Sequence, residues 1–515
     1  MSQTYDLLIC GCGPTGATLA NLLAAKGHRV AIFDRDMEIF HAPRAMMLDA
    51  ESCRIFQSMG IMQKLEKQDS KPFYQHRFVN KNRRKLIDFD FRDLPETFGH
   101  PAVGTYFHQP SLERFLREEF LAHQPRVDMF LGYEVTEVTN GPDVAQLSAR
   151  NSATGGVETF FGHYLVGADG GNSLIRRRIA DRREDLNYSR QWIVMDMIVH
   201  DRGVWDAIRE GAEFKCDANA AVVFVKGHHG HIRLDCETTR EKAATFSEAD
   251  ARRMAHSYFD ASSAEFIRIA PYHFYAGMPT KWRAGRLLIA GDAAHQTSPF
   301  AGQGLNMGLR DAANLAFKFD LIFTGKADER LLDSYEQERW QNCKSVILAA
   351  TANGTILSIS SKWGIFKRDM AFLVARIWQS LGRDIVTRST SYPGYRAGLI
   401  GTSELAGKRL PQPLVTLGDK HVLLDELLGD GFCLLLKQSE TGRDLTTFQT
   451  NLNGRVFTLG EDFTDTENIL ARFMDRHQAL LCRPDKYIFD AGESGNRLCN
   501  DLMEALSQSG KGGAR

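Results

Sequence analysis

The sequence predicts a mixed α/β protein (α+β overall) with more than one domain. Three times, at residues 7–10, 165–166 and 287–290, an apolar run typical of a buried strand stops at a glycine-rich or Gly-Asp junction and leads into a helical pattern. Between the second and third junctions, residues 181–280 alternate polar and apolar residues, which is typical of an antiparallel sheet. At 515 residues, the chain is too long for one hydrophobic core.

The first junction has the pattern of a dinucleotide-binding turn. Residues 5–34 contain an apolar strand, Gly11-x-Gly13-x-x-Gly16, a helical pattern and a second apolar strand that ends at Asp34. In this pattern the first glycine permits a tight turn, the second lets a pyrophosphate approach the backbone, and the third lets the helix pack on the strand. The helix N-terminus attracts phosphate, and the acid accepts a ribose hydroxyl. Because Asp34 disfavours a 2′-phosphate, this Rossmann-type unit is predicted to bind FAD or NAD.

The third junction, in "RLLIAGDAAHQTSPFAGQGLNMGLRDAANLAFKF" (286–319), places Asp292 at the end of a buried strand and starts a helix near Gly302. A second acid of this kind suits the ribityl hydroxyls of FAD. The helix N-terminus would then point at the flavin, where its dipole stabilises negative charge. The alternative is that Asp292 only caps the loop before the helix.

The second junction, "YLVGADGGNSLIRRR" (164–178), again shows a strand, an acid, glycines and a helix. Taken alone, Asp169-Gly170 is also a turn signal. As one of three similar junctions, it is predicted to belong to the same cofactor site. The basic run 176–178 that follows is expected to be a solvated surface.

Composition excludes several other classes of protein. Lys plus Arg total 63 against 64 for Asp plus Glu, so no net field attracts nucleic acid or an anionic membrane from a distance. The N-terminus lacks the features of a signal peptide, and the longest apolar stretch, 346–359, is too short to span a bilayer. The nine cysteines show no CxxC spacing, and no HExxH occurs. We therefore expect a cytoplasmic protein with reduced cysteines, no metal site and no membrane span.

The three junctions, in this order, resemble those of the group A FAD-dependent aromatic hydroxylases, which have the p-hydroxybenzoate hydroxylase fold. The matching segments are "GCGPTGATLANLLAAKG" (11–27), "GADGGNSLIRR" (167–177) and the long motif at 286–319, with shorter matches at "PRA" (43–45) and "FHQPSLERFLR" (107–117). The segments "DSYEQERW" (333–340) and "GKRLPQPLV" (407–415) look closest to the branch of 3-(3-hydroxyphenyl)propionate hydroxylase and phenol hydroxylase.

The resemblance implies a set of FAD-binding residues. They are Gly11, Gly13, Pro14, Thr15, Gly16, Asp34, Arg35, Arg44, Gln109, Asp169, Asp292, Pro299, Gly302, Gly304, Leu305 and Asn306. The first glycines and Asp34 would hold the AMP half, Arg44 and Gln109 the phosphate and ribityl region, and Asp292 the ribityl chain. Asp34 departs from the family, because many relatives carry Glu there, and a shorter acid reaches the ribose less well. Pro299, beside the flavin, is the one candidate for a catalytic contact, and no general base is identified.

The resemblance also implies a domain plan. Residues 1–180 would be the first part of the FAD-binding domain, with some substrate-domain segments near 72–105. Residues 181–280 would form the substrate-binding sheet, and 281–395 the second part of the FAD domain with helices that cover the pocket or form a homodimer surface. Residues 400–515 would be a thioredoxin-like domain, without the CxxC of a redox protein.

In the inserted sheet, Tyr272, Phe274 and Tyr275 are candidates to face a substrate ring, although packing in the sheet's core explains them equally well. The histidines at 228, 229, 231 and 273 have no metal-ligand spacing and are expected to be structural or exposed.

The implied activity is hydroxylation of a phenolic or related electron-rich aromatic ring. NADH or NADPH would reduce the bound FAD, and O2 would then form a flavin C4a-hydroperoxide that transfers oxygen to the small aromatic substrate. The alternatives are epoxidation or Baeyer–Villiger chemistry, a flavin oxidase or dehydrogenase, and a non-catalytic flavin- or NAD-binding sensor.

Overall fold

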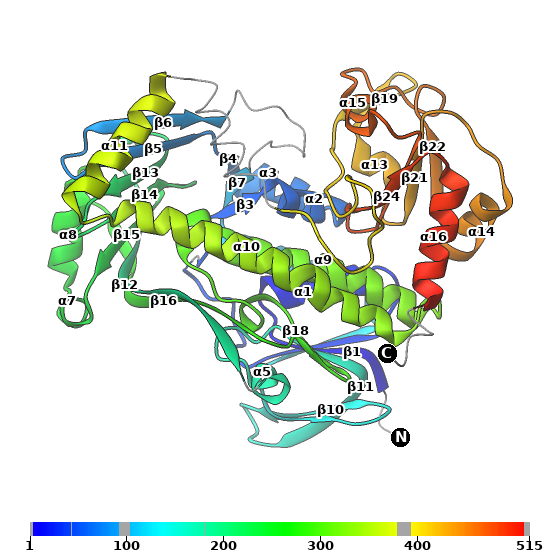
Figure 1. The fold of residues 1–515 in the computed structure, drawn as a ribbon. Coiled ribbons are helices and arrows are strands. Elements are labelled where there is room, and N and C mark those ends of the chain that lie inside the picture. The colour runs from blue at the N-terminus through cyan, green and yellow to red at the C-terminus, as the bar shows by residue number, and fades with distance from the viewer. Residues whose placement is uncertain (1–3, 43, 92–103, 181, 378–392, 509–515) are drawn as a thin grey trace.

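The computed structural model describes residues 4–42, 44–91, 104–180, 182–377 and 393–508 (Figure 1). Pro43 and residues 92–103, which belong to segments singled out above, lie outside the described residues. The described chain forms a sheet with a parallel core and helices, a large sheet whose strand pairs are antiparallel except for β13 with β5, and a C-terminal unit. This mixed architecture confirms the predicted fold class, while the exact domain boundaries stay a prediction.

The parallel sheet aligns the ends of the predicted strands at one edge. Its order is β17 (Arg283–Ala284), β18 (Leu287–Ile289), β11 (Val157–Gly167), β1 (Thr4–Cys10), β2 (Val30–Asp34) and β8 (Val127–Leu131), with β10 (Ala145–Asn151) on β11 and β9 (Tyr133–Asn140) on β10. Cys10 is in register with both Phe33 and Gly167, and Gly167 is in register with Ile289. All three junctions therefore leave the sheet side by side.

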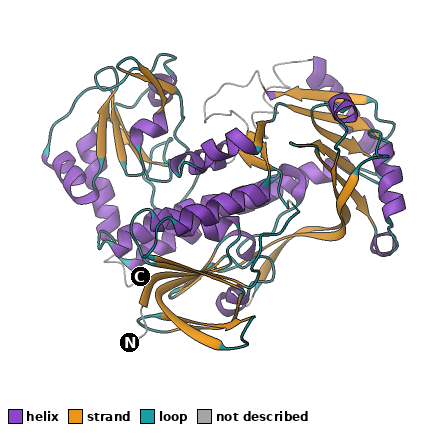
Figure 2. Ribbon diagram, turned by 180° about the vertical axis from the view of Figure 1, so that it is seen from behind, coloured by secondary structure: helices purple, strands orange, loops and turns teal. Residues whose placement is uncertain are grey.

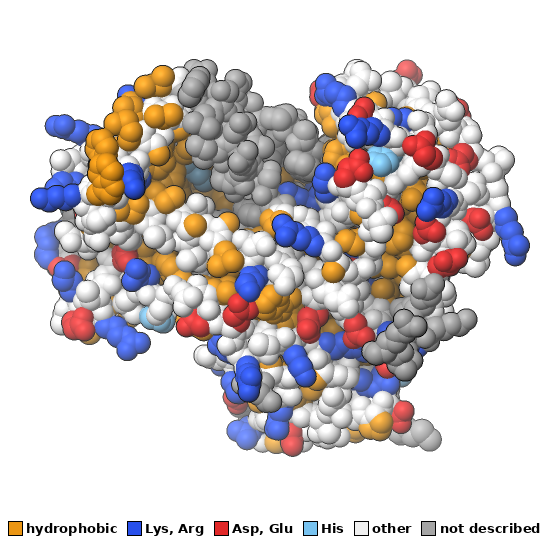
Figure 3. Space-filling model, viewed as in Figure 1, with side chains coloured by type: hydrophobic (Ala, Val, Ile, Leu, Met, Phe, Trp, Pro, Cys, Tyr) orange, Lys and Arg blue, Asp and Glu red, His pale blue; other side chains and the backbone are white. Residues whose placement is uncertain are grey.

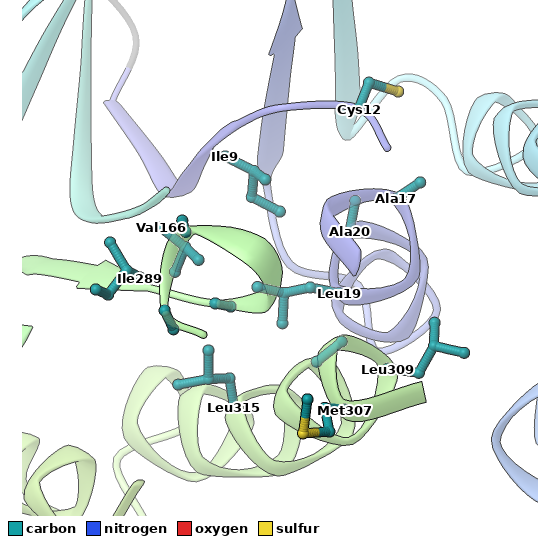
Figure 4. Packing of buried hydrophobic residues seen from close by; sticks show 14 of the residues in the cluster. Ile9, Cys12, Ala17, Leu19, Ala20, Val166, Ile289, Met307, Leu309 and Leu315 are labelled. Atoms are coloured by element: carbon teal, nitrogen blue, oxygen red, sulfur yellow. The ribbon is translucent and has the colours of Figure 1, made fainter. Parts of the chain in front are cut away.

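Two helices pack on this sheet and on each other. Helix α1 (Pro14–Ala24) follows the first junction and α9 (Gln303–Phe323) the third. Figure 4 shows Ile9, Val166 and Ile289 from three strands meeting Leu19 of α1 and Leu315 of α9. A Cβ at Gly308 would lie 2.2 Å from the hydroxyl of Thr15, so glycine lets the two helices touch. Other helices of this region are α2 (Ala50–Ser58), α3 (Ile61–Gln68), α4 (Gln109–Leu121), α5 (Leu174–Ile179), α10 (Asp333–Leu357) and α11 (Lys362–Ile377).

The inserted sheet has seven strands. Their order is β16 (Glu265–Pro279), β12 (Arg183–Ile198), β15 (His231–Thr238), β14 (Val222–Lys226), β13 (Gly211–Cys216), β5 (Gln75–Asn80) and β6 (Lys85–Asp90). Five of these strands lie within 181–280, where an antiparallel sheet was expected, and β5 and β6 come from the segment near 72–105. The long strands β12 and β16 reach from this sheet to the FAD-type domain (Figure 2). Short helices α6 (Arg202–Ala207), α7 (Arg240–Ala244) and α8 (Glu248–His256) and a small sheet, β3 (Met47–Asp49), β7 (Gly104–Phe107) and β4 (Ser70–Pro72), complete this part.

The C-terminal unit is built on a mixed sheet of β22 (Arg455–Thr458), β21 (Cys433–Leu436), β23 (Ala479–Cys482) and β24 (Ile488–Gly492). It also contains β19 (Leu414–Leu417), β20 (Lys420–Leu423), α13 (Leu424–Leu428), α14 (Arg443–Leu452), α15 (Ile469–Met474) and α16 (Gly495–Gln508). Buried ion pairs join it to the body of the protein: Arg483 to Glu338 at 2.8 Å and Arg54 to Asp425 at 2.7 Å. All nine cysteines are buried and form no disulfide.

Among the described residues, no single helix is long and apolar enough to cross a membrane. The bent pair Glu329–Leu357 and Lys362–Ile377 meets that test only when taken together, on length and composition.

Candidate cofactor and active site

The glycine loop after β1 is shaped to receive a ligand. Gly11 has φ +105°, and a Cβ there would lie 2.3 Å from the carbonyl oxygen of Ala168. A Cβ at Gly16 would lie 2.0 Å from the carbonyl oxygen of Gly11, whereas one at Gly13 would meet nothing within 4 Å. Gly13 also caps α1, whose first turn has no side-chain cap and no acid. Packing therefore requires Gly11 and Gly16, while Gly13 leaves open space beside unpaired N–H groups where a pyrophosphate fits.

The same methyl group added at Gly13 and at Gly16 should have opposite consequences. We expect Gly13→Ala to fold like the wild type but to bind FAD on the order of tenfold more weakly, since its Cβ enters the ligand's space. Gly16→Ala should lose ~1–3 kcal/mol of stability through overpacking. Urea denaturation of the apoprotein and fluorescence titration with FAD measure the two effects. Equal FAD affinity for Gly13→Ala and the wild type would contradict the assignment.

Asp34 ties the end of β2 to the glycine loop. Its Oδ2 accepts a 2.7 Å hydrogen bond from the backbone N–H of Cys12, and its Oδ1 accepts one of 3.0 Å from that of Asp36. The carboxylate is thus fixed beside the loop. The side chain of Arg35 is mostly exposed and lies 3.9 Å from the carboxylate of Asp36.

Gln109, at the start of α4, holds the segment around Arg44 in place. Its buried side-chain Oε1 accepts hydrogen bonds from the backbone N–H groups of Arg44 and Ala45 at 3.0 and 2.7 Å. The Arg44 guanidinium is exposed and lies 5.0 Å from the centre of the Phe40 ring. Arg44 also lowers the pKa of Asp292, so the structure brings these two predicted residues within electrostatic reach of each other.

Asp169 stabilises the start of α5. Its Oδ2 accepts from the backbone N–H groups of Leu174 and Ile175 at 2.7 and 3.4 Å, while its buried Oδ1 has no hydrogen-bond partner among the described residues. Burial raises the pKa of this carboxyl. The side chain of Arg176 donates to the carbonyl oxygens of Gly171 and Ala293. The expectation that the whole basic run 176–178 is solvated was therefore wrong for Arg176, which is buried because it ties the second junction to the third.

Asp292 faces the N-terminus of α9. The residue is accessible to solvent although protein atoms surround its carboxylate, and no described residue donates a hydrogen bond to that carboxylate. The surrounding protein raises the pKa of Asp292 by desolvation, while His295 and Arg44 lower it. Helix α9 begins after Gly302, which has φ +60°, and its first turn has neither a side-chain cap nor an acid. A Cβ at Gly304 would lie 4.0 Å from Asp292 Oδ1. An acid without a protein partner therefore lies beside the free N–H groups of a long helix.

The remaining residues of this motif have different placements. Pro299 opens a 3₁₀ turn, Pro299–Ala301, directly before α9, and Leu305 is half-buried. The Asn306 side chain is fully buried, and it accepts from the backbone N–H of Asp49 and donates to the carbonyl oxygens of Met47 and Gly302. Asn306 therefore fixes α9 against β3 through its side chain. Thr15 packs against Gly291 and Gly308, at the contact between the first and third junctions.

A buried ionic cluster that the sequence did not reveal lies behind Asp292. Asp311 of α9 accepts from Arg339 Nε and His295 Nε2, both at 2.7 Å, and from the backbone N–H of Gly291 at 2.9 Å. Burial opposes charging of His295, but Cys343 and Asp311 outweigh it and raise the pKa of His295 to about 10. His295, Asp311 and Cys343 lie close enough to ligate a metal ion, yet Arg339 already donates to Asp311 and to Cys343. The cluster therefore fixes the loop that carries Asp292.

The inserted sheet contributes aromatic residues above this region. Tyr272 is 52% exposed, and its ring centre lies 4.5 Å from that of Phe274. Burial raises the pKa of Tyr272, Asp292 raises it further, and Arg44, Arg233 and Arg268 lower it, so Tyr272 lies within electrostatic reach of the cofactor residues. Tyr275 instead packs against Gly277, and the guanidinium of Arg183 lies over its ring.

Charged residues on the sheet form a second group that sequence reasoning missed. Asp196 accepts from His231 Nε2 at 2.9 Å and from Arg268 Nε at 2.8 Å. Arg233 pairs with Asp235 at 3.1 Å and donates to the backbone carbonyl of Arg44 at 2.7 Å. The signal was present in "HIRLDCE", where every second residue is His, Arg or Asp. That alternation places the side chains of His231, Arg233 and Asp235 on one face of β15, and Arg233 reaches the backbone of Arg44 from there.

Comparison with known proteins agrees with this geometry. The model of the FAD binding domain family matches residues 4–350, and that of the HcaD C-terminal domain matches residues 407–508. The chain belongs to the FAD binding domain family. This result, together with the relatives below, confirms the predicted resemblance: the protein is an FAD-dependent aromatic hydroxylase, and the open glycine loop, the partnerless Asp292 and the uncapped helices α1 and α9 fit the cofactor.

Two curated relatives span nearly the whole chain. A probable NADH-specific resorcinol 4-hydroxylase of Rhodococcus jostii (strain RHA1) is 30% identical, covering 98% of this chain and 96% of that protein. A 3-(3-hydroxy-phenyl)propionate/3-hydroxycinnamic acid hydroxylase of Burkholderia cenocepacia (strain HI2424) is 29% identical, covering 94% of this chain and 93% of that protein.

Solved structures share the fold. Aklavinone-11 hydroxylase, in a ternary complex with FAD and aklavinone, superimposes with a TM-score of 0.80 at 21% identity and covers 99% of each chain. OxyS anhydrotetracycline hydroxylase from Streptomyces rimosus gives a TM-score of 0.76 at 22% identity, covering 98% of this chain and 99% of its own. At such identities the likeness concerns the fold alone.

Proposed function

We propose that the protein hydroxylates a small phenolic ring, with NADH as reductant and O2 as the source of the new hydroxyl oxygen. The observation that carries this proposal is the partnerless Asp292 beside the N-terminus of α9, with Tyr272 of the inserted sheet within electrostatic reach. The name of the Rhodococcus relative specifies NADH and resorcinol, which supports the choice of reductant, and the name of the Burkholderia relative specifies a hydroxyphenyl compound, which supports the choice of a phenol.

Bound FAD supplies the redox chemistry and the activation of oxygen, and the chain binds it and excludes water. Asp292 would accept hydrogen bonds from the ribityl chain, and Asp34 from the adenosine ribose. The uncapped N-terminus of α9 would stabilise negative charge on the reduced ring system through its dipole. Pro299, in the turn before α9, would contact the flavin.

Three guanidinium groups act on the space beside Tyr272. The pKa of the Tyr272 hydroxyl is raised overall, by burial first and by Asp292 next, while Arg44, Arg233 and Arg268 act to lower it. For a phenol bound beside Tyr272, these three guanidinium groups are the charges that would favour its ionisation. An ionised phenol donates electrons to its ortho and para carbons, which are then ready to accept an electrophilic oxygen. Tyr272 and Phe274 would pack against its ring.

The order of electron flow tests this proposal. Under anaerobic conditions, NADH should bleach the flavin absorbance, and faster with a bound phenol than without one. A resorcinol or hydroxyphenylpropionate alone should leave the flavin oxidised. Admission of ¹⁸O2 should restore the absorbance and give a product that carries one labelled oxygen atom.

Two results would contradict the proposal. The protein would be an oxidase if the organic substrate bleached the flavin without nicotinamide, and if O2 then gave hydrogen peroxide and no labelled product. A labelled epoxide or ester in place of a new phenolic hydroxyl would identify epoxidation or Baeyer–Villiger chemistry.

A further inference from the structure

Helix α11 presents an apolar face to solvent. The side chains on this face recur at intervals of three or four residues and are 38% to 72% exposed: Trp363, Phe366, Met370, Val374 and Ile377, here called the α11 stripe. Figure 3 shows hydrophobic side chains gathered at the upper left, where Figure 1 places α11. Single exposed apolar residues are common on soluble proteins, but a contiguous band is a mark of an interaction surface.

The opposite face of α11 accounts for the packing of the helix on the protein. Arg368 and Ala375 are buried there, and the ring of Phe372 lies 5.2 Å from that of Phe78 on β5. The helix therefore already has intramolecular contacts on one face, and the stripe is a second apolar face that is exposed in the part of the chain that the structure describes.

Exposed cations border the stripe. Lys362, Lys367 and Arg376 lie on α11 itself, and Lys367 lies 5.2 Å from the centre of the Trp363 ring. No described acid pairs with these three side chains. The nearest acid on the helix, Asp369, is paired with Arg368 at 2.8 Å.

A neighbouring turn adds to the positive border. The turn between β5 and β6 carries Lys81 and Arg84, both exposed and without an acid partner among the described residues. Asn80, which precedes the turn, is in register with Cys216, and Arg368 of α11 acts electrostatically on Cys216. The turn therefore lies beside the first half of α11, and Figure 1 shows β5, β6 and α11 together at the upper left.

We propose that the α11 stripe docks the protein on the surface of an anionic lipid bilayer. An apolar helix face with Trp and Phe, bordered by Lys and Arg, is the arrangement that lies in the plane of a membrane interface. Anionic headgroups would neutralise the bordering cations. The near-zero net charge of the whole chain means that a membrane does not attract the protein over long distances. The bordering cations can still attract anionic headgroups at short range, because salt screens their field only beyond about 10 Å.

A second copy of the chain fits the stripe less well. Pairing two α11 helices through their apolar faces would bring the cations of both borders together, and the single acid on the helix is already paired within its own chain. An anionic surface opposes the same cations with the opposite charge.

Co-sedimentation with vesicles tests the proposal on the FAD-loaded protein. Vesicles of equal parts phosphatidylglycerol and phosphatidylcholine should bind the wild type at low salt, and vesicles of phosphatidylcholine alone should bind it about tenfold less. The double variant Trp363→Ser/Phe366→Ser should lose about tenfold in binding. Lys362→Gln/Lys367→Gln should also bind less and show a weaker dependence on salt.

The matched control is Leu414→Ser/Leu417→Ser, which removes two exposed leucines of β19 outside the stripe and should bind like the wild type. Absence of binding to anionic vesicles, or equal binding by wild type and Trp363→Ser/Phe366→Ser, would overturn the proposal. The proposal would also be overturned if sedimentation velocity showed a dimer for the wild type and a monomer for Trp363→Ser/Phe366→Ser, because the stripe would then be an interface between copies. NADH oxidation in solution by all three double variants should match that of the wild type, which verifies their folding.

Discussion

Replacing Asp311 by alanine should destabilise the protein by ~3–5 kcal/mol, because the change leaves buried cations without their counterion. The carboxylate pairs with Arg339 and His295, and all three side chains are fully buried. A loss of this size is a large fraction of the ~5–15 kcal/mol that stabilises a typical protein. Urea denaturation of the apoprotein measures the effect directly, without a contribution from cofactor binding.

Asp333→Ala is the matched control. Asp333 pairs with Arg283 at 2.7 Å, the same distance as Asp311 from Arg339, but its side chain is 58% exposed. Solvent screens such a pair, so its loss should cost ~0–1 kcal/mol. Similar losses in the two variants would mean that the buried cluster does not have the predicted role.

The pH dependence gives a second readout of the same cluster. The pKa of His295 is raised from 6.5 to about 10, so its charged form stabilises the folded state. This contribution to stability is fully present below pH 6.5, the ordinary pKa of histidine, and is lost as the pH rises toward 10. In Asp311→Ala the pKa of His295 should fall, and the decline in stability between these pH values should become shallower.

Much of the fold and of the cofactor site could be predicted because the informative residues lie next to each other in the sequence. Gly11, Gly13 and Gly16 follow one strand, Asp34 ends a second, and Asp292 lies in the turn directly after a third. In a parallel sheet the carboxyl ends of such strands share one edge, so local patterns fix which residues converge. The register of Cys10 with Phe33 and Gly167 satisfies that rule.

The buried clusters could not be predicted because their members have no common local pattern. Asp311 and Arg339 belong to different helices, and each reads as an ordinary polar residue of an amphipathic helix. The pairing of Arg233 with the backbone of Arg44 joins residues 189 positions apart, one on β15 of the inserted sheet and the other in the loop before β3. The sequence also suggested that helices after residue 340 cover the pocket or a partner, but only the three-dimensional packing shows which face of α11 is left exposed.

Replacing Asp292 by alanine should weaken FAD binding by one to two decades. The ribityl hydroxyls would lose a charged acceptor, and a hydrogen bond to a charged group contributes ~1.5–3 kcal/mol. The FAD affinity of Asp292→Asn should lie between those of Asp292→Ala and the wild type, because the amide oxygen still accepts a hydrogen bond but carries no charge. Fluorescence titration of the apoproteins with FAD measures the three affinities.

The stability of the apoprotein separates this role of Asp292 from that of a loop cap. Desolvation raises the pKa of Asp292, and no described residue donates a hydrogen bond to its carboxylate. A group whose folded-state pKa is raised destabilises the folded state once it is ionised, so without FAD the Asp292→Ala variant should melt at the same temperature as the wild type or slightly higher. With saturating FAD, the wild type should gain more in melting temperature than the variant, because tighter binding stabilises the folded state further. A lower melting temperature of the variant apoprotein, with unchanged FAD affinity, would instead identify Asp292 as a structural cap of the loop before α9.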